Sequence, residues 1–125
     1  MIYDIAKKRL LTEDLREGLE VLLVTDSYVP DAAHQTVADV EADEFSDANY
    51  SRKMVQNVVV RDNGTSFDID GDDVFWDATL TGTVGGVVFF YPGFLLAFFD
   101  TEDKVLDGSG FKVKSGSEGI VGVNV

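Results

Sequence analysis

Residues 84–99 read VGGVVFFYPGFLLAFF and form the longest apolar stretch of the chain. Within it, two short runs rich in aromatic and β-branched side chains flank the dipeptide Pro92-Gly93. Runs of this length and composition, bounded by glycine and proline, are typical of strands that are buried on both faces. The stretch therefore predicts two buried strands joined by a tight turn, and we expect this hairpin to form the centre of the core.

Shorter strand-like segments lie on both sides of the hairpin, separated by turn-forming Gly, Asn and Asp residues. The expected strands are residues 18–25, 55–60, 65–69, 74–76, 111–114 and 119–125. Residues 111–114 alternate apolar and basic, so we expect a half-exposed strand with its lysines in water. We expect residues 18–25 at the centre of a sheet, and a hairpin turn at Asn63-Gly64, because this dipeptide tolerates positive φ. Turn signals that recur every 8 to 12 residues or so favour a sandwich. The fold prediction is mainly β: an antiparallel β-sandwich of about seven or eight strands with one or two short helices.

Two segments carry weaker helical signals. Thr12 precedes acidic residues as a helix N-cap would, which predicts a short helical turn after an opening strand or arm. Residues 36–44, with Val37 and Val40 on one side, predict a short helix lying over the sheet.

Length and composition favour one β-sandwich domain, residues 1–125, with residues 1–11 as a possible N-terminal arm or edge strand. The chain has no cysteine, so it can form neither a disulfide nor a thiolate metal site. The apolar stretch is interrupted by glycine and proline and is shorter than the roughly 20 residues of a spanning helix, so we expect no membrane segment. At the N-terminus basic residues follow apolar ones, the reverse of a secretory leader.

The charge balance is strongly acidic, with 23 acidic against 10 basic residues and a net charge of −13. A nucleic-acid partner is not expected, because phosphate binding needs clustered Lys and Arg, and the only basic cluster is Lys7-Lys8-Arg9. Two interpretations of the acidity remain open. In the first, the acidic residues keep a β-protein soluble and stop the edges of its sheets from pairing with other chains. In the second, they adapt the chain to high salt, where the repulsion between its own charges is screened over roughly 3 Å.

The segment from Asp68 to Asp73 is the main candidate for a metal site, because its carboxylates could converge on Ca²⁺ if the loop curled. The ligand candidates are Asp68, Asp70, Asp72 and Asp73. The match to an EF-hand loop is incomplete, since Asp73 stands where glycine is required and Thr79 stands where a bidentate glutamate is required. A solvated turn is the favoured interpretation, so no cofactor is predicted and Ca²⁺ stays a weak candidate.

No combination of residues predicts catalysis, and we expect the protein not to be an enzyme. His34 is the only histidine and has no cysteine or second imidazole with which to share a metal. A nucleophile-elbow pattern is absent from the sequence. Trp76 could serve as a stacking platform for a sugar, but a lone Trp within an apolar strand is more often a core residue.

The order of turn and strand residues along the chain carries a resemblance to a known group of proteins. After a strand come Tyr28-Val29-Pro30-Asp31 and His34, then Asp39-Val40 with Glu41 and Glu44, then Asn49-Tyr50-Ser51-Arg52. Later come Phe67, residues 70–76, LLAFFD at 95–100, Phe111-Lys112-Val113 and Glu118-Gly119-Ile120. In this order residues 15–125 resemble small structural proteins of tailed viruses of bacteria and archaea. The acid excess departs from the more balanced composition expected of that group and makes a halophilic archaeal host plausible.

The resemblance implies a virion component, a head-decorating protein or a neck or collar piece, without enzymatic activity. We therefore expect a homo-oligomer that is located on the virion and binds a major capsid or neck protein. An N-terminal arm with Ile2, Tyr3 and Ile5 could bury apolar surface against such partners, or the same residues could complete the core of the chain itself. The alternative hypothesis is a stand-alone module that binds Ca²⁺ or carbohydrate.

Overall fold

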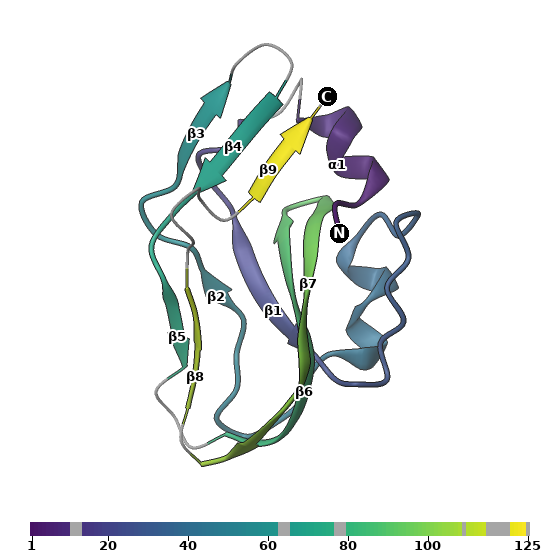
Figure 1. Ribbon diagram of the computed structural model, residues 1–125, viewed down its shortest axis with the longest axis vertical. Helices are drawn as coiled ribbons and strands as arrows, with labels where there is room; N and C mark the ends of the chain where they lie inside the picture. Colours follow the sequence, from purple (N-terminus) through teal and green to yellow (C-terminus); the bar gives the residue numbers. More distant parts are fainter. Residues whose placement is uncertain (11–13, 63–65, 77–79, 109, 115–120, 125) are drawn as a thin grey trace.

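The computed structural model describes residues 1–10, 14–62, 66–76, 80–108, 110–114 and 121–124 (Figure 1). Within these residues the chain is mainly β, and every strand pairing is antiparallel. The elements are α1 (Asp4–Arg9), β1 (Glu20–Val24), the 3₁₀ turns η1 (Val37–Asp39) and η2 (Glu41–Asp43), β2 (Lys53–Met54), β3 (Val59–Asp62), β4 (Ser66–Asp70), β5 (Val74–Trp76), β6 (Thr81–Tyr91), β7 (Phe94–Asp107), β8 (Phe111–Val113) and β9 (Val121–Asn124). This sandwich-like arrangement confirms the predicted fold class.

The predicted apolar hairpin forms the centre of the larger sheet, whose strand order is β2-β1-β6-β7. The turn between β6 and β7 is Pro92-Gly93, and Gly93 adopts φ +94, which an L side chain rarely tolerates. Both strands extend beyond the quoted stretch, to Thr81 on one side and Asp107 on the other. As predicted, β1 lies inside the sheet, between β2 and β6.

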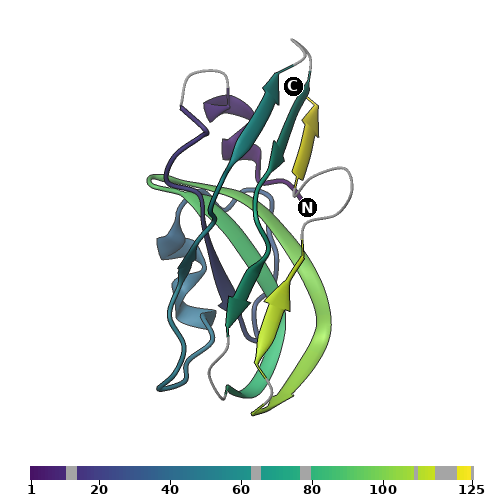
Figure 2. The same cartoon turned by 90° about the vertical axis from the view of Figure 1, so that its left-hand side faces the viewer.

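Two smaller sheets form the second layer, with strand orders β3-β4-β9 and β5-β8. They follow one another along the long axis and face the four-stranded sheet (Figures 1 and 2). Pairing of Asp62 with Phe67 confirms the predicted hairpin between β3 and β4. The predicted Asn63-Gly64 turn of that hairpin lies outside the described residues.

The central strands are buried on both faces, which explains their uninterrupted apolar sequence. On the inner face, side chains such as Val87, Phe89 and Leu96 pack against the second layer. On the outer face, Val88 and Leu95 belong to a separate apolar cluster with the N-terminal segment and the region around η1 and η2. The four-stranded sheet is therefore the middle of three layers.

The helical segments differ from the sequence prediction. Residues 36–44 form two 3₁₀ turns, η1 and η2, rather than one helix, and Thr36 and Asp39 close a capping box around η1. Polar Asp side chains bond to nearby backbone N–H groups, which favours tight turns over a continued helix. Near the N-terminus, α1 replaces the expected opening strand, because Ala6 and Leu10 stand at helical spacing and are both buried. The predicted cap Thr12 lies outside the described residues.

Candidate docking surface

The outer face of the β5–β8 sheet exposes a large aromatic side chain. In β5, Val74 and Trp76 are buried, while Phe75 between them is 54% exposed. Alternation along a strand sends Phe75 to the face opposite its neighbours. Phe75 lies across from Lys112 of β8 in the antiparallel register, so the two side chains share the outer face.

Beside Phe75 the surface is hollowed into a shallow groove of about 300 Å³. Its lining residues are Phe75, Lys104, Gly110, Phe111 and Lys112, from β5, β7, β8 and the β7–β8 connection. Gly110 adopts φ +79, and a Cβ there would stand 2.6 Å from the carbonyl oxygen of Trp76. The connection can therefore approach β5 this closely only with glycine at position 110.

A rigid aromatic stack supports the groove from inside. The indole of Trp76 lies between Tyr50 and Phe111, with ring centroids 6.3 and 6.1 Å away. Its Nε1–H donates a hydrogen bond of 2.7 Å to the carbonyl oxygen of Ser51. With its polar atom satisfied and its ring buried, Trp76 holds β5 in place and so fixes the position of Phe75.

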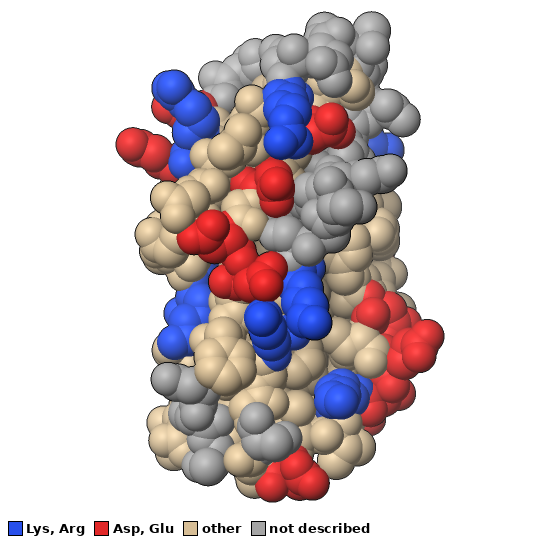
Figure 3. Space-filling model, turned by 60° about the vertical axis from the view of Figure 1, so that its left-hand side comes forward, with Lys and Arg blue, Asp and Glu red and all other residues tan. Residues whose placement is uncertain are grey.

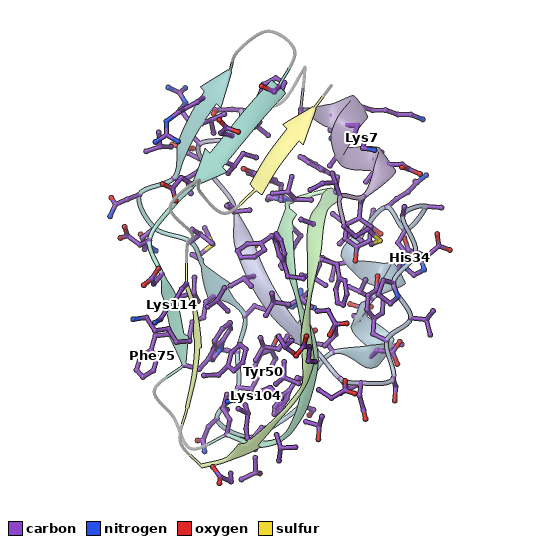
Figure 4. All side chains as sticks on the ribbon, in the orientation of Figure 1. Lys7, His34, Tyr50, Phe75, Lys104 and Lys114 are labelled. Carbon is purple, nitrogen blue, oxygen red and sulfur yellow. The ribbon has the colours of Figure 1, made fainter. Side chains whose placement is uncertain are left out.

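The groove is basic although the chain as a whole is acidic. Lys104 and Lys112 line it, and the exposed Lys114 follows on the same edge (Figure 4). Figure 3 shows basic side chains gathered in the middle of this face of the molecule. Lys112 Nζ lies 3.5 Å from Asp73 Oδ2, an exposed ion pair that solvent screens. An apolar ring among ammonium groups is suited to bind an acidic surface that carries some apolar area.

The four predicted calcium ligands do not come together as a ligand set. Asp68 and Asp70 lie on one face of β4, opposite the buried Phe67 and Ile69. Asp72 Oδ2 accepts a hydrogen bond of 2.6 Å from the side-chain amide of Asn57. Asp73, directly before β5, forms an ion pair with Lys112 of β8. Among the described residues, no three His, Cys, Asp or Glu side chains are grouped so that they could hold a metal ion.

Trp76 and His34, the other residues considered from the sequence, make contacts that give them structural roles. Trp76 is 1% exposed, which confirms the core assignment. Nδ1 of His34 is hydrogen-bonded to the Tyr28 hydroxyl at 2.9 Å, and that hydroxyl is bonded to the Tyr3 hydroxyl at 2.7 Å. Burial is the main cause that raises the pKa of Tyr3, and the hydrogen bond with Tyr28 raises it further. The Tyr3 hydroxyl therefore stays neutral.

The predicted arm residues belong to the core of this chain. Tyr3 is fully buried, and Ile2 and Ile5 pack partly buried against the apolar clusters. Ile2 forms an isolated antiparallel bridge with Ala97, as an edge strand would. Of the two roles considered for these residues, the structure shows the completion of the core, and the candidate surface lies elsewhere.

A second charged cluster fastens the segment around residues 44–52 to β1. The Leu23 N–H donates to the Tyr50 hydroxyl at 3.1 Å, which in turn donates to Glu44 Oε2 at 2.6 Å. Arg52 donates to both oxygens of Glu44, at 3.0 and 2.7 Å. Burial opposes the charged form of Glu44, but the bonds from Arg52 and Tyr50 outweigh it and lower the pKa of that carboxyl. These hydrogen bonds among the cluster's own members give it a structural role.

The aromatic residue of the groove was missed by sequence reasoning, although its signal was present. Strand alternation would place Phe75 on the face opposite Trp76 once Trp76 is assigned to the core, and the structure shows this buried–exposed–buried pattern over Val74-Phe75-Trp76. Lys112 of β8 and Lys114 just after it were correctly expected in water. Lys104 could not be assigned, because its place depends on how far β7 extends past the apolar stretch.

Comparison with family models, with curated proteins and with solved structures finds no match to this chain. In the parts of the chain that the structure describes, no helix combines the length and the apolar character needed to cross a membrane. The site must therefore be interpreted from its own geometry.

Proposed function

We propose that the protein is a non-enzymatic structural subunit of a tailed-virus particle, which docks through the β5–β8 face onto neighbouring particle proteins. The observation that carries the proposal is the exposed Phe75, held by a rigid aromatic stack and surrounded by the lysines of the groove. Large exposed aromatics on a rigid support are typical of residues that dominate protein–protein interfaces. The resemblance of residues 15–125 to small virion proteins supports the choice of assembly.

Burial of the Phe75 ring supplies affinity, and the lysines supply orientation. Removal of apolar surface from water contributes about 25 cal/mol per Å², and every copy in a repetitive particle contributes again. Ammonium groups around the ring select acidic surfaces and disfavour basic ones. Under this proposal the chain is located on the virion, and this face binds a neighbouring particle protein, a capsid or neck protein or another copy of the chain, whose contact surface is partly apolar and carries acidic groups.

The alternative of a stand-alone Ca²⁺ or carbohydrate module has less support. Its metal ligands would be Asp68, Asp70, Asp72 and Asp73, which have different surroundings in the structure. Its stacking platform would be Trp76, which is buried. No observation on the described residues favours this function over docking.

The proposal is tested with particles from a culture whose virus carries the gene. We expect mass spectrometry of the purified particles to find the chain in many copies, and the gene to lie among portal, capsid and tail genes. A gene complemented with Phe75→Asp should give particles that lack the chain. Val29→Asp is the matched control, because Val29 is an exposed apolar residue, 77% accessible, on a different surface. Particles without the wild-type chain would overturn the proposal.

A further inference from the structure

We infer that the β5–β8 face binds a second copy of the same chain and forms a two-fold symmetric dimer. The inference rests on the proposed docking role of this face and adds the identity of one partner. It follows from the arrangement of positive and negative charge around Phe75.

An irregularity in β7 places acidic residues directly beside the groove. Val84 pairs with Lys104 and Gly86 pairs with Asp100, so residues 101–103 of β7 stand opposite only one residue of β6. In this bulge Glu102 and Asp103 adopt φ values of 56 and 54, which are uncommon for residues other than glycine.

The bulge is held in a defined shape. Thr101 Oγ1 donates a hydrogen bond to the Val84 carbonyl at 2.5 Å, and Asp100 Oδ1 accepts one from the Glu102 N–H at 2.7 Å. Glu102 and Asp103 are exposed and immediately precede Lys104, which lines the groove. A fixed acidic margin therefore adjoins a basic centre, and Figure 3 shows both signs of charge on one face.

A face with a basic part beside an acidic part is complementary to itself across a two-fold axis that passes between the two parts. In such a contact residue i meets residue j and j meets i, so the acidic bulge of each copy meets the lysines of the other. Each Phe75 ring lies beside the lysines and is then covered by the partner copy. An entirely acidic partner would satisfy the lysines but would be repelled by Glu102 and Asp103. A second copy satisfies both halves of the face.

Salt concentration should control this association. Two chains of net charge −13 repel each other over long distances in dilute salt. At physiological ionic strength the screening length is about 8 Å, which weakens this repulsion more than it weakens contacts within an interface. We therefore expect association to increase from dilute buffer to physiological salt.

The first experiment is sedimentation equilibrium of the purified wild-type chain at several protein and salt concentrations. We expect a reversible monomer–dimer equilibrium and a loss of dimer of at least tenfold in Phe75→Asp. Val29→Asp should dimerise as the wild type does. Circular dichroism checks that both variants are folded. A wild-type chain that stays monomeric at millimolar concentration, or a Phe75→Asp variant that dimerises normally, would overturn the inference.

The second experiment exchanges the charges. Lys104→Glu with Lys112→Glu reverses the charge of the groove lysines, and Glu102→Lys with Asp103→Lys reverses the charge of the bulge. Each double variant alone should be monomeric, and an equimolar mixture should form a heterodimer. Lys7→Glu with Lys8→Glu on α1 is the control for the lysine double variant, because it makes the net charge more negative by the same amount. Apart from the added long-range repulsion between the copies, this control should leave the dimer intact. A mixture that does not associate contradicts the two-fold contact.

The two proposals fail in distinguishable ways. A monomeric chain that is nevertheless abundant in particles removes the dimer and leaves the virion function. A dimer that follows the charge exchange, from a chain absent from particles, supports the inference and removes the virion function.

Discussion

At the scale of single residues, Gly86 is a position where the core tolerates little change. A Cβ added there would collide with the Phe98 ring and would lie 2.9 Å from the carbonyl oxygen of Phe99. We expect Gly86→Ala to lower the free energy of unfolding by about 3 kcal/mol, because the central hairpin would have to separate locally. Urea unfolding followed by tryptophan fluorescence measures the change.

Gly108→Asn is the control for this prediction. Gly108 has positive φ, as Gly93 does, but open space surrounds its missing Cβ. Asn tolerates such a backbone better than most residues, so the expected cost is about 1 kcal/mol or less. A loss at position 86 no larger than the loss at position 108 would mean that the contact with Phe98 does not decide stability at position 86.

The Glu44 carboxylate makes stability depend on acidity. Its pKa is lowered in the folded chain, so its stabilising effect is present above the ordinary glutamate range and is lost as pH falls through the lowered pKa. We expect Glu44→Gln to cost about 1–3 kcal/mol at pH 7, because charged hydrogen bonds to Arg52 and Tyr50 are weakened. The cost should shrink steadily as pH falls from about 5 to about 3.

Urea unfolding of wild type and Glu44→Gln across this pH range measures the difference directly. Glu17→Gln is the control, since Glu17 is exposed, and its difference from wild type should stay small throughout. A pH-independent cost at position 44 would show that the loss comes from packing and not from charge.

Sequence and structure agree best, residue by residue, where burial decides the side chain. Trp76 was predicted in the core and is there, and Lys112 was predicted in water and is exposed. The groove was not predictable, because it joins Phe75 to Lys104, residues whose meeting depends on how β7 passes β8. Contacts between distant strands are not encoded in local periodicity.

At the scale of elements, the N-terminal segment completes the edge of β7. The Tyr3 N–H donates to the Leu96 carbonyl at 3.1 Å, and the Phe98 N–H donates to the Met1 carbonyl at 2.9 Å. Tyr3 and Ala6 are fully buried. Deletion of residues 1–9 would therefore remove core side chains and expose an apolar sheet edge.

We expect this deletion to lower the urea midpoint strongly and to cause aggregation. Tyr3→Ala alone should cost about 3–5 kcal/mol, the usual range for truncating a buried aromatic. Lys7→Ala with Lys8→Ala, on the exposed side of α1, is the control and should change stability by less than about 0.5 kcal/mol. A deletion variant that stays soluble with an unchanged midpoint would support a detachable arm instead.

Strands were easier to predict than helices in this chain. The segments at 20–24, 74–76 and 111–113 form strands as predicted, since β-branched or aromatic residues and bounding turns identify them. By contrast α1 was missed, because six residues are too few for a hydrophobic period to stand out. Burial of Ala6 and Leu10 against the sheet supplies the stability that the local sequence lacks.

At the scale of the whole molecule, the net charge of −13 should couple stability to salt. We expect the urea midpoint to rise between about 0.05 M and about 1 M KCl, because the screening length falls well below the size of the domain. A variant with Glu17→Gln and Asp26→Asn should start higher in dilute buffer and rise less. A wild-type midpoint that does not change with salt would remove the interpretation of salt adaptation.

The overall architecture was predictable because the apolar hairpin permits few arrangements. Two adjacent strands buried on both faces require a covering layer on each side. The sequence indicated the strands of one covering layer, but not that these strands divide into two sheets. That division depends on where β4 ends and β5 begins, near Gly71, which a pattern of alternating residues does not specify.

The topology also has a consequence for the order in which the chain acquires its shape during synthesis. β6 and β7 are neighbours in sequence and can close their hairpin as soon as both have left the ribosome, at small entropic cost. β4 must wait for its partner β9, which follows it in the chain only after the hairpin and β8. A ribosome-bound nascent chain should therefore hold a formed hairpin with a half-built covering layer until β9 has left the ribosome and completed the β3-β4-β9 sheet.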